Sequence, residues 1–358
     1  MQTQNVSTDG LDTAFRAYFG LSDVMRRAQG DALSALGLGP DECPHRIIAS
    51  GAHWRLRDYA PDAVSPSLMV VAAPIKRPYI WDLTPSISAI RYCLSQGLGI
   101  YLLEWLPASR DTGNNGLDEY ASAIFECIAT ISQRCAGAKP FVIGHSLGGT
   151  LAALAIAAAP ESVRGLVLLG APLCFEAGES RFRDALVCLI PSDLSGEEPV
   201  PGSLLSQMSA LASPGTFIWS RFQDAALSVT DRQAMDIHAR VERWALDEAA
   251  LPGKLVREMI EQLYRENGFF LGTLHITGKR VGPFSLSIPT LAVVNTADEV
   301  APSASVKPVI DAIPAKDARI IEYPGETGVC LQHLGILVGR KARAEVWPEI
   351  IAWIKAHG

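Results

Sequence analysis

The sequence predicts an α/β fold in which a mostly parallel central sheet is flanked by helices and carries an inserted, largely helical cap. Short runs of Val, Ile and Leu without polar alternation indicate strands that are buried on both faces. Segments with apolar residues at helical spacing separate these runs, as expected when crossover helices join parallel strands. This alternation is interrupted between residues 176 and 283, which predicts an insertion in the sheet domain.

Residues 1–40 are predicted to form an N-terminal helical extension. Apolar side chains recur at helical spacing over residues 11–36, and a Gly-Leu-Gly-Pro stop ends the pattern. We expect this helix to pack against the main body, and a contact with a membrane or a partner is the alternative. A hairpin of residues 47–50 and 54–58 follows it.

The core is predicted over residues 41–175 and 284–358. Candidate strands span residues 67–72, 99–104, 140–143, 165–169, 290–295 and 319–323. Candidate helices span residues 87–96, 117–133, 150–159 and 347–356. Between them, residues 176–283 are rich in proline and aromatic residues and contain helix-like pieces at 232–245 and 255–266. We expect this cap to cover the carboxyl ends of the strands, where open α/β sheets bind ligands.

Composition restricts the class of protein. The 358 residues are 48% hydrophobic and 19% charged, which suffices for one large core with a cap. The net charge is −7 and no block of Lys or Arg occurs, so a nucleic-acid partner is not expected. Because the chain shows neither a signal-peptide pattern nor an apolar run of roughly 18 residues, we expect no integral membrane segment and a cytoplasmic location.

The seven cysteines are scattered along the chain and are mostly embedded in apolar segments. This pattern favours free thiols in a reducing compartment over a disulfide framework. No Cys or His cluster has the spacing of zinc ligands. The sequence therefore predicts neither a metal site nor a cofactor.

Residues 144–148, Gly-His-Ser-Leu-Gly, form the candidate nucleophile motif. The G-x-S-x-G pattern lies between an apolar strand and an alanine-rich helix, where a nucleophile on a tight strand-to-helix turn is found. Gly144 and Gly148 leave room for this turn, and Ser146 projects from it. The helix behind Ser146 directs N–H groups toward a forming oxyanion. The alternative is a glycine-rich turn that carries an ordinary serine.

A serine nucleophile needs a base and a carboxylate that orients the base. Asp298 follows the strand at 290–295 and is the candidate acid, with Glu299 as its rival. His333 follows the last strand and is the candidate base, whereas His145 is expected to pack or hydrogen-bond locally. The alternatives are a capping aspartate and a structural histidine. The order Ser, acid, His is that of α/β-hydrolases and predicts this fold.

Two backbone N–H groups are expected to form the oxyanion hole. One is the N–H of Leu147, the residue after the nucleophile. The other should come from the loop after the strand at 67–72, where Pro74 has no N–H and Ile75 is the candidate. The sequence thus proposes five site residues from four separate segments.

From about residue 54 to its end, the chain resembles the polyhydroxyalkanoate synthases, in particular the short synthases that work with a separate partner subunit. Similar segments occur in the family's order at residues 55–61, 74–83, 104–105, 117–120, 244–247, 251–253, 272–278, 298–302 and 333–335. The family has G-x-C-x-G-G at the nucleophile, whereas this chain has Ser146. Gln332 also replaces the glycine that precedes the histidine in the family.

The resemblance implies an acyl substrate, and the serine changes the expected reaction. A serine oxyester is lower in energy than a thioester and transfers less readily to another alcohol, while water can still attack it. We therefore expect a serine-dependent hydrolase that acts on an ester or thioester of a (hydroxy)acyl chain through an acyl-serine intermediate. The alternatives are a synthase or acyltransferase that uses hydroxyacyl-CoA, and a non-catalytic granule-associated protein. The expected partner is a small acyl ester or acyl-CoA, and a homodimer through the cap is left open.

Overall fold

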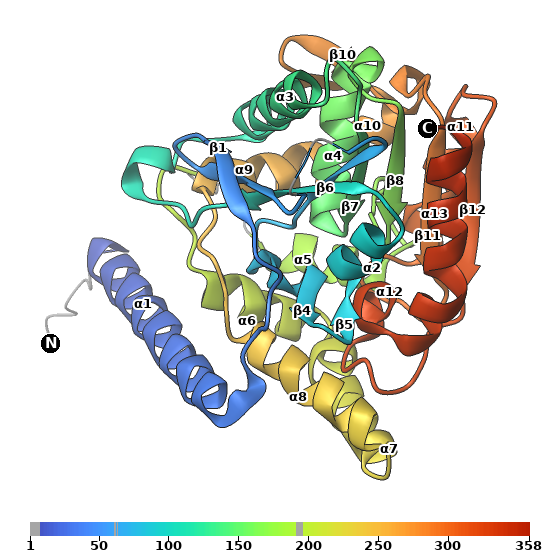
Figure 1. The fold of residues 1–358 in the computed structure, drawn as a ribbon. Coiled ribbons are helices and arrows are strands. Elements are labelled where there is room, and N and C mark those ends of the chain that lie inside the picture. Colours follow the sequence, from blue (N-terminus) through green and yellow to red (C-terminus); the bar gives the residue numbers. More distant parts are fainter. Residues whose placement is uncertain (1–7, 61, 63, 191–195) are drawn as a thin grey trace, which may run out of the picture.

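A mostly parallel sheet forms the centre of the molecule (Figure 1). The computed structural model describes residues 8–60, 62, 64–190 and 196–358. Within these residues the sheet has eight strands: β1 (Arg46–Ser50), β2 (Trp54–Asp58), β3 (Ser67–Val71), β6 (Gly99–Trp105), β7 (Phe141–His145), β8 (Gly165–Leu169), β11 (Thr290–Asn295) and β12 (Ala318–Tyr323). Their order is β1-β2-β6-β3-β7-β8-β11-β12, with antiparallel pairing only of β2 to β1 and β6. The predicted fold class is confirmed.

Successive side chains of a strand point to opposite faces of the sheet. Helices cover both of these faces. The core helices are α2 (Ala89–Ser95), α3 (Leu117–Arg134), α4 (Leu147–Ala158), α11 (Lys307–Ala312), α12 (Gly335–Val338) and α13 (Trp347–Ala356). Val142 and Val294 belong to the cluster that includes side chains of α3, α4 and α11. Ile143 and Val293 belong to the cluster that includes side chains of α2, α12 and α13. Because the helices pack on the two faces, the carboxyl ends of the strands remain uncovered by them. The loops that carry the candidate site follow these ends.

The helix predicted for residues 87–96 begins two residues later than expected. Ile87 and Ser88 form strand β5 (Ile87–Ser88), which pairs with β4 (Asp82–Thr84). Ser88 then accepts a hydrogen bond from the Arg91 N–H at 2.8 Å and caps α2. The cap residue therefore fixes the start of this helix.

Between β8 and β11 the chain leaves the sheet and forms mostly helices. These are α5 (Arg181–Leu189), α6 (Gly202–Ala212), α7 (Ser220–Ser228), α8 (Arg232–Ala245), α9 (Gly253–Glu258) and α10 (Gly268–Leu271), followed by a hairpin of β9 (Leu274–Ile276) and β10 (Lys279–Val281). Figure 1 shows α5, α6 and α8 below β6 and β7. We propose that residues 176–283, called the insertion below, act as a cap on a core of residues 41–175 and 284–358.

The N-terminal helix α1 (Thr8–Leu33) packs against the insertion (Figure 1). Asp23 accepts a hydrogen bond from the Ser203 N–H of α6 at 2.8 Å. Arg26 forms an ion pair with Glu248 at 2.8 Å. These contacts are the ones expected of a helix that packs on the main body. Residues 1–7 of the predicted extension lie outside the described residues.

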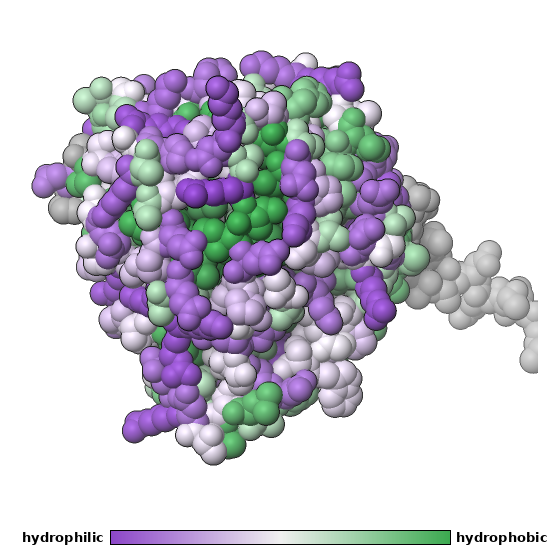
Figure 2. Space-filling model, turned by 90° about the vertical axis from the view of Figure 1, so that its right-hand side faces the viewer, coloured by the Kyte–Doolittle hydropathy of each residue, from purple (hydrophilic) through white to green (hydrophobic). Residues whose placement is uncertain are grey.

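One face of the molecular surface combines hydrophilic and hydrophobic areas. Figure 2 shows polar and charged residues around a hydrophobic patch near the centre of this face. None of the helices in the described ranges combines the length and the hydropathy needed to cross a bilayer. The insertion also exposes large apolar side chains, among them Trp219 and Phe222. A homodimer through this segment stays a prediction.

Candidate active site

Ser146 lies at the sharp turn between β7 and α4. Its φ of 54° and ψ of −133° are rare for a residue with a side chain and are typical of strained functional positions. Its N–H donates to the carbonyl of Leu169 on the neighbouring strand at 3.0 Å. Its carbonyl accepts from the N–H of Thr150 at 3.0 Å, inside the first turn of α4. Strand and helix together hold the strained residue.

Three glycines allow this turn to be so tight. A Cβ on Gly144 would lie 2.6 Å from backbone atoms of Gly149. A Cβ on Gly148 would lie 2.3 Å from the carbonyl oxygen of Val71, and a Cβ on Gly149 would lie 2.6 Å from the Cβ of Ala171. The start of α4 therefore packs directly on the backbone of the sheet, as the glycine-rich motif predicts.

Replacing Gly148 with alanine is expected to reduce the free energy of unfolding by about 1–3 kcal/mol, because the added methyl group overlaps backbone atoms that cannot rotate away. Urea titration measures this change. Gly20→Ala is the matched control, since nothing lies within 4 Å of a Cβ at this exposed position of α1. Alanine there should instead stabilise the helix by up to about 1 kcal/mol. Equal stabilities of the two variants would contradict the packing of the turn.

The predicted acid and base are in contact. Asp298 lies three residues after the end of β11, and His333 lies in the short helical turn η9 (Gln332–Leu334). The His333 Nδ1 and Asp298 Oδ2 atoms are 2.6 Å apart, and both residues are buried. The chain thus brings together two residues that the sequence placed after different strands.

Asp298 is held as a carboxylate. Its second oxygen accepts hydrogen bonds from the N–H groups of Val300 at 2.8 Å and Ala301 at 3.2 Å. Burial alone raises the pKa of Asp298, but His333 and these two N–H groups outweigh burial and bring the pKa below its ordinary value. A charged Asp298 orients the His333 ring with its Nδ1–H toward the carboxylate.

The other ring nitrogen of His333 is available for chemistry. Its Nε2 atom is buried and has no hydrogen-bond partner among the described residues. His333 and Ser146 line the same cavity. An imidazole that is oriented through Nδ1 and lines the same cavity as a serine can accept the proton of the hydroxyl when Nε2 is free of a proton.

Glu299, the rival acid, is engaged elsewhere. Its carboxylate accepts a hydrogen bond from Thr216 in η5 (Gly215–Trp219) of the insertion. Asp298 contacts the base, while its neighbour Glu299 ties the same loop to the insertion. The geometry therefore favours Asp298 as the acid.

His145 contacts His333, the predicted base, which is a more specific role than the local packing or hydrogen bonding expected for it. Its Nε2–H donates to the backbone carbonyl of His333 at 2.8 Å, and the two ring centroids are 4.6 Å apart. Burial, with a smaller contribution from His333, lowers the pKa of His145 to about 3. The ring is therefore neutral at physiological pH.

The free energy of unfolding is expected to decrease as the pH falls below about 6.5. His145 has an ordinary pKa of 6.5 when exposed and a pKa of about 3 when folded, so the unfolded chain binds the extra proton between these values. The neutral His145 should therefore lower the free energy of unfolding by about 1.4 kcal/mol for each pH unit between these two pKa values as the pH falls. Above pH 6.5 it should have no effect.

Urea titrations at pH 7.5 and pH 5 measure this effect. His145→Gln should flatten the dependence on pH, whereas His275→Gln at an exposed position of β9 should leave it unchanged. If His145→Gln left the pH dependence of the free energy of unfolding unaltered, the ring of His145 would not be buried in its neutral form.

The two predicted oxyanion donors lie at the same cavity as Ser146. Leu147 is the first residue of α4, and Ile75 lies in the loop after β3. The carbonyl of Ile75 accepts a hydrogen bond from the Ala249 N–H at 3.1 Å, which ties this loop to the insertion. Oxyanion binding by the N–H groups of Leu147 and Ile75 stays a prediction.

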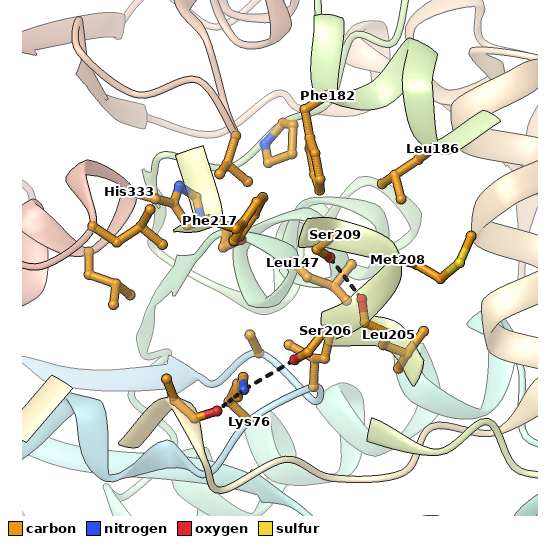
Figure 3. Close-up of a pocket in the computed structure, with 18 of the residues that line it drawn as sticks. Lys76, Leu147, Phe182, Leu186, Leu205, Ser206, Met208, Ser209, Phe217 and His333 are labelled. Carbon is orange, nitrogen blue, oxygen red and sulfur yellow. Dashed lines mark hydrogen bonds between the residues drawn. The ribbon is translucent and has the colours of Figure 1, made fainter. Parts of the chain in front are cut away.

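A cavity of about 420 Å³ lies over Ser146. Its wall is largely apolar and aromatic and includes Phe175, Phe182, Leu186, Met208, Phe217 and Tyr264. Figure 3 shows Phe182 and Phe217 projecting into it, and their ring centroids are 5.3 Å apart. A cavity with this lining suits an extended apolar group of a ligand.

Lys76 adds a partly buried cation to the cavity wall. Its ammonium group contacts Glu248 at 3.0 Å and the carbonyl of Ala245. It also contacts the Ser206 hydroxyl at 3.4 Å (Figure 3). Burial lowers the pKa of Lys76 to about 8, although Glu248 opposes this shift. Because its donors all have partners in the insertion, Lys76 joins the loop after β3 to that segment.

Asp224 on α7 fixes the loop that carries His333, and the sequence analysis missed it. Its carboxylate accepts the N–H groups of Gly328 at 2.7 Å and Cys330 at 2.8 Å. Nothing local marks Asp224, because these partners lie more than 100 residues away in the chain.

Gln332 closes the same loop on itself. Its side-chain amide donates to the carbonyl of Glu326 at 2.7 Å and accepts from the Glu326 N–H at 3.3 Å. The carbonyl of Gln332 accepts from the Asn295 side chain at 2.7 Å. Gln332, which stands where the resembling family has a glycine, therefore connects the loop of His333 to the end of β11.

Comparisons with known proteins agree with this fold. A family model described as the alpha/beta hydrolase fold matches residues 86–185. The chain is 28% identical to the poly(3-hydroxyalkanoate) polymerase subunit PhaC of Haloferax mediterranei, over 97% of this chain and 71% of that protein. It is 26% identical to the subunit of the same name from Allochromatium vinosum, over 82% of each chain.

Solved structures match in fold. A soluble variant of monoglyceride lipase from Saccharomyces cerevisiae superimposes with a TM-score of 0.54 at 10% identity, over 89% of this chain and 96% of that one. A putative hydrolase from Bacillus subtilis gives a TM-score of 0.52 at 13% identity, over 93% and 98%. The structural matches show that the chain has the α/β-hydrolase fold, and its sequence is similar over most of its length to poly(3-hydroxyalkanoate) polymerase subunits.

Proposed function

We propose that this protein is a serine-dependent hydrolase that cleaves an ester or thioester of a (hydroxy)acyl chain through an acyl-serine intermediate. One observation carries the proposal: the buried Asp298–His333 pair presents an unpartnered Nε2 in the cavity that Ser146 also lines. The fold and the relatives are those of enzymes that transfer or hydrolyse acyl groups, which supports an acyl substrate.

In this mechanism the Ser146 hydroxyl attacks the acyl carbonyl and passes its proton to His333 Nε2. Asp298 stabilises the imidazolium that forms, and the N–H groups of Leu147 and Ile75 donate to the oxyanion. His333 then protonates the departing alcohol or thiol. Water attacks the acyl-serine with His333 as base, and the free acid leaves while Ser146 recovers its proton.

The apolar cavity over Ser146 supports an acyl chain as the substrate group. Its size and its aromatic wall provide space for a short chain beside the reacting carbonyl. All seven cysteines are free thiols, and six of them are buried, which supports a reducing compartment such as the cytoplasm.

A synthase or acyltransferase is the second candidate, and the names of the sequence relatives favour it. Exchange between two thioesters is nearly neutral in free energy and can therefore repeat many times. Transfer from a thioester substrate to Ser146 gives a more stable oxyester, which water can cleave but a second alcohol accepts less readily. The serine thus favours hydrolysis over chain growth.

Product analysis with 3-hydroxybutyryl-CoA and with p-nitrophenyl esters tests the proposal. We expect free acid in an amount equal to the free thiol from the CoA thioester or to the p-nitrophenol from the ester. We also expect no polymer, and labelling of Ser146 by a fluorophosphonate probe. Solvent-extractable polymer would support the synthase instead. A chain that turns over neither substrate and resists the probe would be a non-catalytic granule-associated protein.

A further inference from the structure

Three side chains with metal-binding atoms converge beside the base loop. His238 and Glu242 lie on α8, and Cys330 lies three residues before His333. Their ligand atoms all lie within 4.8 Å of one another. The Sγ atom of Cys330 is 3.2 Å from Glu242 Oε1, and His238 Nε2 is 3.8 Å from the same oxygen. Ligand atoms around a tetrahedral zinc ion are about 3.5 Å apart, so this cluster already has nearly the required size.

His238 is oriented as a ligand. Its Nδ1 atom contacts the Asp224 carboxylate at 3.1 Å, so Nδ1 carries the proton and Nε2 faces Glu242 and Cys330. Metal-binding histidines commonly donate their second ring nitrogen to a carboxylate in this way. His238 and Cys330 are only 8% and 3% exposed, whereas the side chain of Glu242 is 35% exposed, so two of the three ligands are shielded from bulk water.

We propose that His238, Glu242 and Cys330 bind a zinc ion, with a fourth position occupied by water from the cavity that Cys330 lines. One thiolate, one imidazole and one carboxylate form a ligand set that suits zinc better than magnesium or calcium. On binding, the Cys330 S–H bond breaks and a Zn–S bond forms, while the proton leaves to solvent. Glu242 Oε1 exchanges the thiol hydrogen bond for a bond to the ion.

Arg221 opposes the ion and provides an independent test. Its guanidinium group contacts both oxygens of Glu242, with Nε at 2.6 Å from Oε1. A zinc bond through Oε1 alone leaves Oε2 paired with Arg221. Because the positive charge of Arg221 lies next to the ion, Arg221→Gln should strengthen zinc binding.

The ligands lie on separate elements, which explains why the sequence analysis predicted no metal. His238 and Glu242 are four residues apart on a helix, but Cys330 follows 88 residues after Glu242. A bound ion would join α8 of the insertion to the loop of His333. Zinc should therefore raise the Tm of the full-length protein, and a chelator should reverse this change.

Zinc titration of the chelator-stripped protein against a chromophoric competitor tests the proposal. We expect one equivalent of zinc to bind, and at least tenfold weaker binding in Cys330→Ser and in the isosteric Glu242→Gln. Cobalt should give a thiolate charge-transfer band that Cys330→Ser removes. Cys188→Ser, at the exposed cysteine, should match the unaltered protein in both measurements.

Circular dichroism of each variant separates loss of the site from loss of the fold. The proposal is overturned if the protein binds less than one equivalent of zinc, or if folded Cys330→Ser and Glu242→Gln keep the original affinity. Weaker binding in Arg221→Gln would also count against it. These outcomes are independent of esterase activity, so the catalytic proposal can stand or fall separately.

Discussion

Replacing Ser146 with alanine is expected to lower kcat for p-nitrophenyl ester hydrolysis by about 10⁴–10⁶, because the nucleophile of the proposed acyl-enzyme is removed. KM should change by only a few fold, since the cavity wall over residue 146 is unaltered. Labelling by a fluorophosphonate probe should disappear. Steady-state kinetics and intact-mass analysis measure both effects.

Ser95→Ala is the matched control for this substitution. Ser95 is exposed at the end of α2, and its hydroxyl donates to the carbonyl of Tyr92. We expect wild-type kinetics and full labelling in this variant. If Ser146→Ala kept more than a tenth of the activity, Ser146 would not be the nucleophile.

The Asp298→Asn substitution is expected to lower kcat by about 10³–10⁴ with a small change in KM. The amide preserves the shape of the side chain, but it cannot stabilise the imidazolium of His333. It also allows its own N–H to face His333 Nδ1, which favours the tautomer that has the proton on Nε2. That tautomer cannot accept the proton of Ser146.

Glu299→Gln distinguishes the acid from its neighbour. Glu299 contacts Thr216 and not His333, so removal of its charge should change kcat by less than tenfold. Steady-state kinetics of the two variants at pH 8 give the comparison. Similar losses of kcat in the two variants would mean that His333 depends on the position of the loop and not on the charge of the Asp298 carboxylate.

Ser146→Cys tests why this chain should hydrolyse its substrate. The thiol would form a thioester intermediate, the kind that the resembling family uses for repeated transfer. We expect this variant to release acid more slowly and to form oligomers from 3-hydroxybutyryl-CoA. Product identity in the two forms can be compared by chromatography.

The central strands could be predicted closely from the sequence. Residues 165–169 and 290–295 form β8 and β11 with the predicted bounds, because strands buried on both faces end where the apolar run ends. Helix starts were less predictable. The helix predicted from Thr150 begins at Leu147, since close packing on the sheet overrides the poor helix propensity of Gly148 and Gly149.

The site could be predicted where its residues follow strands and carry local signals. Ser146 has a motif, and Asp298 and His333 each follow an apolar run, so their loops were placed at one edge of the sheet. The choice between Asp298 and Glu299 needed the side-chain contacts. Asp224 could not be found, because its role consists of hydrogen bonds to a distant loop.

Two neighbouring parts of the insertion hold the loops of Asp298 and His333. Thr216 holds the loop of Asp298 through Glu299, and Asp224 holds the loop of His333 through the Cys330 N–H. An outward swing of η5 and α7 would therefore release both loops together. With the insertion swung outward, Asp298 and His333 would lose their alignment and the enzyme would be inactive. Closure around an acyl chain would restore the proton-transfer path. Such an interlock would confine the reaction of the proposed nucleophile to the closed state, in which a substrate is enclosed.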